Sequence, residues 1–258
     1  MRIIYLSIYL MILSGTACAD PNENLSPRDA VPEKLQRLLK AYPETLASAS
    51  RNRLRWKDGT EMIFDDSIGN KDFETMLNSP DLEDQMSMTY PAGHSFKPPP
   101  QKNADPGRVR YEPFFMKMYG NSAATVSGKL ASVRWLPQTV NSLLKITTVN
   151  RVNEKLQAIS DELDALPALK KYLAPSAGTF HWRTVRGENR LSAHSFGIAI
   201  DINVKYGNYW QWDTDLSYKN RIPLEIVEIF EKHGFIWGGK WYHYDTVHFE
   251  YRPELLIK

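Results

Sequence analysis

The alternation of apolar and polar residues is most regular in the last third of the chain. In segment 197–203 isoleucines alternate with small or polar residues, which predicts a strand that buries its isoleucines and carries Asp201 on the other face. Segment 247–251 alternates in the same way and predicts a second strand, with His248 and Glu250 on the face opposite its apolar residues. Side chains that could bind a ligand or take part in catalysis therefore share one face of each predicted strand.

Helical periodicity marks three other segments. Apolar residues recur at helical spacing over 150–166, and shorter helices are expected over 32–39 and 223–233. Segment 53–64 reads as a hairpin with an Asp-Gly turn.

Composition narrows the class of protein. The chain has 258 residues, a formal net charge of +2, 42% hydrophobic and 24% charged residues, all ordinary for a folded globular protein. Disorder and a multi-span membrane protein are set aside. The charges form no basic stripe, so we expect no nucleic-acid partner.

Residues 1–19 read as a secretory signal. A short positive start precedes an apolar run over 3–13, which is too short for a membrane span of about 20 residues, and small residues follow up to Ala19. Cleavage after Ala19 predicts export to the periplasm, cell envelope or extracellular space, with no transmembrane span in the mature form. Cys18 permits an alternative, a lipid anchor of the lipoprotein kind, but Gly15 is small for that pattern and favours soluble export.

Two further segments are expected after the signal. Residues 20–104 are polar and rich in loops, and they end at a triple proline that is stiff enough for a boundary. Residues 105–258 hold the regular patterns. Cys18 is the only cysteine, so a mature chain that lacks it has no disulfide, and any metal must use His, Asp or Glu.

Two of the histidines stand beside acidic strand residues. His194 precedes the strand that carries Asp201, and His248 lies in the second strand. Two imidazoles and one carboxylate form the ligand set of an open catalytic zinc site. A single isolated histidine is more often structural, and His94 and His233 are left out on that ground.

The spacing of these residues resembles a known family. Ser192-Ala-His194-x-x-Gly-x-Ala-x-Asp201, followed by Asp245-x-x-His248-Phe-Glu, is similar to the paired signature of the M15 family of zinc peptidases. That family contains D-alanyl-D-alanine carboxypeptidases and dipeptidases and L-alanyl-D-glutamate endopeptidases. The resemblance covers roughly residues 105–258, and segment 20–104 resembles nothing named here.

The resemblance implies a role for each matching residue. His194, Asp201 and His248 would be the zinc ligands, and Asp245 the general base that takes a proton from the zinc-activated water. The resemblance further makes Arg183 the group that stabilises the oxyanion and places Ser192 beside the substrate.

Several assignments have alternatives. Arg186 and Arg190 could reach the site in place of Arg183. Glu250 is interpreted as a hydrogen-bond partner of His248 rather than a ligand. Asp245 and His248 would point to opposite faces of a regular strand, so the roles require a turn near Thr246. His181 and His243 flank the motifs, and either lining the cleft or a structural role is open for them.

Taken together, the resemblance implies an exported α+β zinc peptidase, with a small antiparallel sheet carrying the zinc site and helices packed on one side. Its substrate would be a peptidoglycan stem peptide. Asp at position 245 favours an L-alanyl-D-glutamate endopeptidase over a D-alanyl-D-alanine carboxypeptidase. A non-catalytic cell-wall-binding module is the alternative from another class. Segment 20–104 could also be a partner-binding or inhibitory arm.

Overall fold

The structure is a computed structural model that describes residues 30–212 and 215–258. Residues from Val31 to Lys258 form one compact unit. The predicted signal at 1–19, and Cys18 with it, lie outside the described residues.

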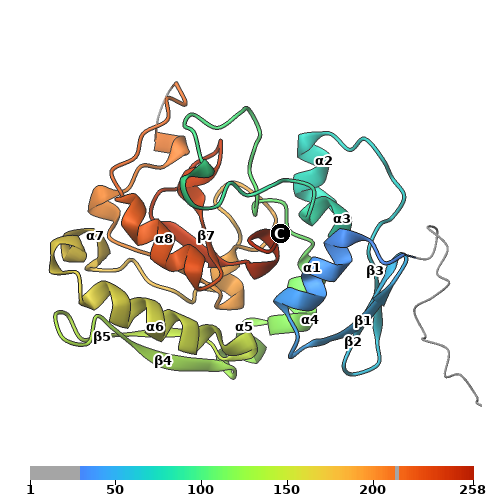
Figure 1. Ribbon diagram of the computed structural model, residues 1–258, viewed down its shortest axis with the longest axis horizontal. Helices are drawn as coiled ribbons and strands as arrows, with labels where there is room; N and C mark the ends of the chain where they lie inside the picture. The colour runs from blue at the N-terminus through green and yellow to red at the C-terminus, as the bar shows by residue number, and fades with distance from the viewer. Residues whose placement is uncertain (1–29, 213–214) are drawn as a thin grey trace, which may run out of the picture. The chain divides into compact units, whose positions relative to one another are not determined.

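Short helices and short strands follow one another along the chain (Figure 1). The α-helices are α1 (Glu33–Ala41), α2 (Phe73–Asn78), α3 (Leu82–Gln85), α4 (Glu112–Tyr119), α5 (Ala123–Ser127), α6 (Val152–Asp164), α7 (Lys170–Leu173) and α8 (Leu224–Lys232). The strands are β1 (Leu46–Ser50), β2 (Arg53–Trp56), β3 (Glu61–Ile63), β4 (Leu130–Trp135), β5 (Ser142–Thr147), β6 (Ala199–Asp201), β7 (Phe235–Trp237) and β8 (His248–Tyr251). Helices and small antiparallel sheets in one unit agree with the expected α+β class.

The elements expected from sequence are present, with ends that differ by one to several residues. The predicted helices correspond to α1, α6 and α8, and the predicted hairpin corresponds to β2 and β3. The two alternating segments correspond to β6 and β8. Most predictions ran one to several residues too long, because hydrophobic spacing continues into the flanking turns while regular hydrogen bonding does not. The helix predicted over 32–39 instead ended too early, because α1 continues to Ala41.

Three antiparallel sheets are present among the described residues, where the sequence had suggested one small sheet with a separate hairpin. Their strand orders are β1-β2-β3, β4-β5 and β6-β8-β7. The last of them is the expected small sheet. Its middle strand, β8, is hydrogen-bonded on both sides, which fixes the position of His248 at the start of the strand.

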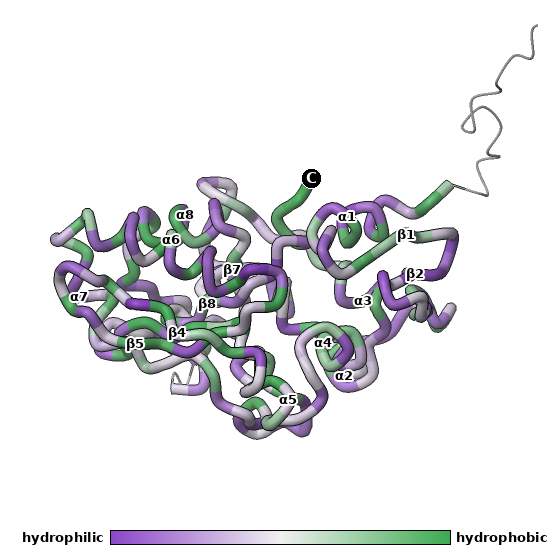
Figure 2. Tube along the Cα trace, turned by 90° about the horizontal axis from the view of Figure 1, so that it is seen from below, coloured by the Kyte–Doolittle hydropathy of each residue, from purple (hydrophilic) through white to green (hydrophobic). Residues whose placement is uncertain are grey.

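Helices α6 and α8 pack beside one another, α6 against β4 and β5, and α8 against β7 (Figure 1). Apolar and polar residues are interspersed along both helices, as the tube in Figure 2 shows, and most of the apolar ones are buried, whereas Leu224 at the start of α8 is exposed. The ring of Phe230 in α8 stacks on Phe249 in β8 at a centroid distance of 3.9 Å. This contact holds the β6-β8-β7 sheet against a helix.

The N-terminal segment shares the hydrophobic core of the rest of the unit. Leu35 and Leu38 of α1 are fully buried, and Tyr42 meets the ring of Phe114 edge-on at 5.7 Å. Tyr90 donates a hydrogen bond to Glu231 of α8. A separate role for segment 20–104 stays a prediction.

Among the residues that the structure describes, no helix is both long and apolar enough to cross a membrane.

Candidate active site

Asp201 and His248 face each other across two paired strands. In the antiparallel β6–β8 pair, Asp201 stands directly opposite His248, and opposite residues point to the same side of a sheet. Oδ1 of Asp201 lies 2.9 Å from Nδ1 of His248. The register of one short strand pair thus brings together two residues that are 47 positions apart.

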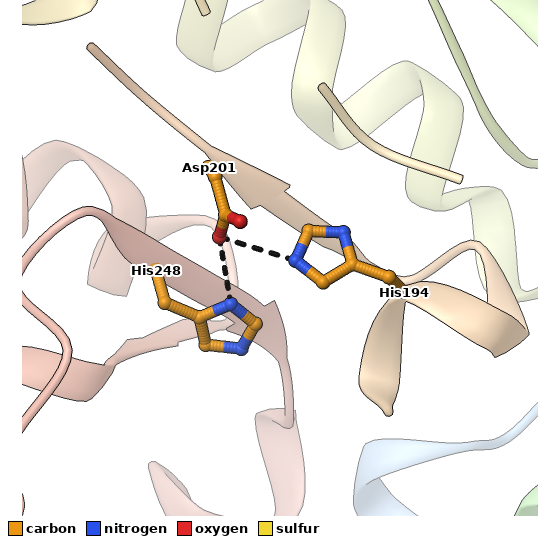
Figure 3. A group of neighbouring side chains, drawn as sticks. All are labelled: His194, Asp201 and His248. Carbon is orange, nitrogen blue, oxygen red and sulfur yellow. Dashed lines mark hydrogen bonds and ion pairs between the residues drawn. The ribbon is translucent and has the colours of Figure 1, made fainter. Parts of the chain in front are cut away.

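His194 reaches the same carboxylate from a turn just before β6. It lies in the 3-10 helix Ala193–Phe196, which Ser192 caps with its hydroxyl and which ends at Gly197 in the left-handed conformation, φ 64°. Nε2 of His194 lies 3.1 Å from Oδ1 of Asp201. Figure 3 shows both imidazoles converging on Asp201.

Gly197 is needed for that turn. A positive φ strains residues with a Cβ, and a Cβ at this position would lie 2.8 Å from Cδ2 of Leu130 in β4. The carbonyl oxygen of Gly197 also accepts a hydrogen bond from the Thr147 amide at 2.9 Å. The glycine therefore sets the distance between His194 and Asp201.

Hydrogen bonds on the far side of each ring decide which nitrogen faces the centre. Nδ1 of His194 bonds to the carbonyl oxygen of Thr179, and buried Nε2 has no hydrogen-bond partner among the described residues. In His248 the two ring nitrogens have the opposite roles: Nε2 bonds to Oε2 of Glu250 at 3.2 Å, and Nδ1 faces Asp201. Such partners fix the tautomer of a metal-binding histidine and leave the other nitrogen available.

Electrostatics at the centre favours the ionised form of the Asp201 carboxylate. Burial raises the pKa of Asp201, but the proximity of the His194 and His248 rings, with the hydrogen bond from His248, outweighs it and holds that pKa below its usual range. Burial lowers the pKa of His248, but its bonds to Asp201 and Glu250 outweigh this and raise the pKa to about 10. A metal that binds Nδ1 of His248 would therefore displace a proton.

The residues present fit a zinc ion. His194, Asp201 and His248 each offer one ligand atom, and these atoms lie within 4.8 Å of one another. Buried Nε2 of His194 faces Oδ1 of Asp201 at 3.1 Å without making a hydrogen bond, and a cation bound by both atoms would satisfy this nitrogen. Two nitrogens and one oxygen suit zinc and match the open, three-ligand form of a catalytic site.

Asp245 enters the same cleft through the expected irregular backbone. Residues 246–247 form a turn before β8, and the amide of His248 donates to the carbonyl oxygen of Asp245 at 3.3 Å. Burial, with the negative charge of Asp201, raises the pKa of Asp245 to about 6. A carboxyl group with such a pKa can exchange protons near neutral pH.

A cleft of about 420 Å³ opens over the centre. Every site residue expected from the sequence lines it, together with a group of arginines and aromatic side chains: Arg108, Arg110, Arg183, Arg186, Arg190, Ser192, His194, Asp201, Tyr209, Trp210, Trp212, Trp241, His243, Asp245, His248 and Glu250. The cleft therefore combines an acidic and histidine-rich floor with cationic and aromatic walls.

The three arginines considered for contact with the substrate differ in burial and in their hydrogen bonds. Arg183 and Arg186 are exposed, and the Arg183 backbone is bonded to the Ser195 hydroxyl. Arg190 is buried, where its guanidinium bonds to Glu188 and to the carbonyl oxygen of Arg108. Arg183 and Arg186 can thus move toward a ligand, whereas Arg190 is held by the protein.

The structure adds a buried pair that sequence reasoning missed. Asp105 is fully buried and accepts hydrogen bonds from the backbone amide of His243 at 2.8 Å and from its Nδ1 at 2.5 Å. The His243 ring lines the cleft and meets Trp210 edge-on at 4.7 Å. No spacing signal could have found this pair, because its members are 138 positions apart.

The remaining histidines lie elsewhere. His94 is exposed beside Glu228, and His233 bonds to Glu162. His181 is exposed and is not among the described residues that line the cleft. Of the two flanking histidines left open by the sequence, His243 alone takes part in the cleft wall.

A comparison with protein families finds a match over the part of the chain that carries this centre. Residues 186–251 match the family model described as D-alanyl-D-alanine carboxypeptidase. The match confirms the resemblance to M15 family peptidases and supports a peptidase. It includes Ser192, Asp245 and the three grouped residues, and it begins after Arg183. No curated protein and no solved structure matches the chain.

Proposed function

We propose that the protein is an exported zinc peptidase that hydrolyses peptidoglycan stem peptides. The observation that carries this proposal is the nitrogen arrangement around Asp201, where Nε2 of His194 and Nδ1 of His248 both face one carboxylate. The family match supports the peptidase chemistry. Export rests on the signal pattern at residues 1–19 and gives the protein access to the cell wall.

The metal-binding residues would be His194, Asp201 and His248. Zinc held there would supply a Lewis acid and lower the pKa of water. Thr179 and Glu250 hold the two rings so that their ligand nitrogens need little reorganisation.

Asp245 is proposed as the general base. Its carboxylate oxygen takes the proton from the attacking water and returns it to the nitrogen of the leaving amine. Arg183 at the exposed wall would pair with the charge that develops on the scissile carbonyl oxygen, and Ser192 would bind the neighbouring backbone of the substrate. The cleft walls of tryptophan and arginine would orient the peptide and exclude water.

Two bonds of the stem peptide are candidates. Asp rather than Glu at position 245 favours an L-alanyl-D-glutamate endopeptidase. The description of the matching family model favours a D-alanyl-D-alanine carboxypeptidase. We place the endopeptidase first, because the residue at the base position is part of the reacting site.

Digestion of purified muropeptides by the zinc-loaded protein, read by mass spectrometry, tests the proposal. Loss of terminal D-alanine would assign a carboxypeptidase, and release of the peptide after L-alanine would assign an endopeptidase. His194→Ala, which removes a ligand, is expected to abolish either product. A zinc-loaded wild type that cleaves no stem peptide would favour the cell-wall-binding module instead.

A further inference from the structure

A chain of buried charged side chains leads from His248 away from the cleft. Glu250 holds Nε2 of His248 with one oxygen and accepts a 3.0 Å hydrogen bond from Arg252 with the other. Arg252 then donates through Nε to Glu254 at 2.6 Å. Glu250, Arg252 and Glu254 are all fully buried.

The chain ends in the N-terminal segment. The hydroxyl of Tyr42, which follows α1, donates to the second carboxylate oxygen of Glu254 at 2.6 Å. Arg37 of α1 donates to the Glu254 backbone carbonyl at 2.8 Å. Tyr42 and Glu254 are 212 positions apart, so this is a tertiary contact between the two ends of the compact unit.

Each member of this chain depends on its neighbours. Isolated buried charges are strongly unfavourable, and they persist only when they are paired and hydrogen-bonded. Glu250 is balanced by Arg252, at 3.0 Å, and by Arg110, whose Nη1 lies 3.6 Å away. Glu254 in turn uses one oxygen for Arg252 and the other for Tyr42.

A purely structural cluster could end anywhere in the core, but this one ends on a candidate ligand. The bond from Nε2 of His248 to Glu250 orients the ring and leaves Nδ1 for the centre. No described residue of segment 30–104 lines the cleft. The N-terminal segment therefore acts on the centre through relays of contacts. Besides the chain that ends on His248, Phe73 of this segment stacks on the cleft residue His243 at 5.7 Å.

We propose that Tyr42, Glu254, Arg252 and Glu250, here called the Tyr42–His248 chain, position the His248 ring for metal binding. The N-terminal segment then contributes to zinc affinity although it supplies no ligand. Tyr42 and Glu250 act as positioning residues. The inference rests on one part of the proposed function, namely that the centre binds zinc.

The test measures zinc dissociation constants of the full chain by competition with a chromophoric chelator. Tyr42→Phe removes the buried hydroxyl that donates a hydrogen bond to Glu254, and the new side chain carries no charge. The matched control is Tyr90→Phe, because Tyr90 is also buried in the N-terminal segment and also donates to a glutamate, Glu231, at 2.5 Å. Both variants lose a hydrogen bond from tyrosine to glutamate, and only Tyr42 lies on the chain. Tyr90→Phe additionally removes the acceptor of the Trp237 amide at 3.0 Å, so it is the more severe loss of hydrogen bonding.

We expect Glu250→Gln to weaken zinc binding about 10- to 100-fold, the range typical for the direct partner of a ligand. Tyr42→Phe should have a smaller effect, about 3- to 10-fold, because Tyr42 acts through three intervening residues, and Tyr90→Phe should leave zinc binding unchanged. The visible absorption of the cobalt-substituted protein should shift in Tyr42→Phe and not in Tyr90→Phe. Tyr42→Phe serves as the decisive variant if Glu250→Gln does not fold.

Equal zinc affinities and equal cobalt spectra for Tyr42→Phe and Tyr90→Phe would overturn this inference and leave the proposed function standing. A folded wild type that binds no zinc would overturn both.

Discussion

Asp201 lies opposite His248 in the β6–β8 pair, and their facing atoms, Oδ1 and Nδ1, are 2.9 Å apart. The side-chain period of a strand is two, so a register shift of one residue would turn one of them away from the other. Phe249 of β8 packs on Phe230 in the core, and a register shift would remove it from this contact, which opposes the shift. The candidate centre therefore depends on core packing directly beneath it.

Removing the shared carboxylate should remove the metal. We expect Asp201→Asn to lower zinc affinity by more than roughly 100-fold, because losing a ligand should exceed the 10- to 100-fold cost of losing a ligand's partner. The control is Asp161→Asn on the exposed surface of α6, which should leave affinity unchanged. Chelator competition measures both, and retained zinc affinity in Asp201→Asn would contradict the ligand assignment.

Gly197→Ala should destabilise the fold beside the centre. The added methyl meets Leu130 and the backbone is held at a positive φ, so we expect a loss of about 2 kcal/mol in the free energy of unfolding. Urea denaturation measures it. Gly69→Ala, where an added Cβ meets nothing within 4 Å, should stay within about 0.5 kcal/mol of wild type. Equal effects of the two substitutions would refute the strain argument.

The Asp105–His243 pair predicts a pH-dependent contribution to stability. Burial raises the pKa of Asp105, but the bond from His243 and the charge of Arg108 outweigh it, and the folded pKa lies below its usual value. A carboxyl group with a lowered pKa stabilises the fold above its unfolded pKa of about 3.9, and that contribution is lost as pH falls toward the folded pKa.

Asp105→Asn should accordingly lower the free energy of unfolding by about 2–3 kcal/mol at pH 7, as for other hydrogen bonds to charged groups. The loss should be smaller below about pH 4. Urea midpoints of both proteins across this range measure the difference. A difference that does not shrink on acidification would show that the Asp105 charge contributes nothing.

The arginine assignment can be tested with two exposed residues of the same wall. If Arg183 stabilises the oxyanion, Arg183→Ala should lower kcat about 100- to 1000-fold at little change in KM. Arg186→Ala provides the comparison, because Arg186 is likewise exposed and lines the cleft. A larger loss of kcat in Arg186→Ala would transfer the role to that residue.

Local patterns in the sequence predicted the parts of the site that lie on regular strands. Alternation placed Asp201 and His248 on polar faces, and the requirement that Asp245 share their cleft predicted the turn at Thr246. The contact of Glu250 with His248 was expected for the same reason, since residues two apart on a strand share a face.

Contacts made by backbone atoms and by distant segments could not be predicted in this way. The carbonyl oxygen of Thr179 that orients His194 is present in any residue, so no side-chain type marks it. Asp105 and Tyr42 meet their partners only through the tertiary fold. Alternation also failed to show that both faces of β8 are buried, because Arg110 and Arg252 cover the polar face.

The most direct test of the account compares wild type with Asp245→Asn for zinc content and stem-peptide hydrolysis in the same preparations. Asp245 is proposed as the base and supplies no ligand, so both proteins should bind one zinc, while cleavage by the variant should fall at least about 100-fold. Zinc in both proteins with equal cleavage would contradict the role of Asp245. Absence of zinc from the folded wild type would contradict the metal centre itself.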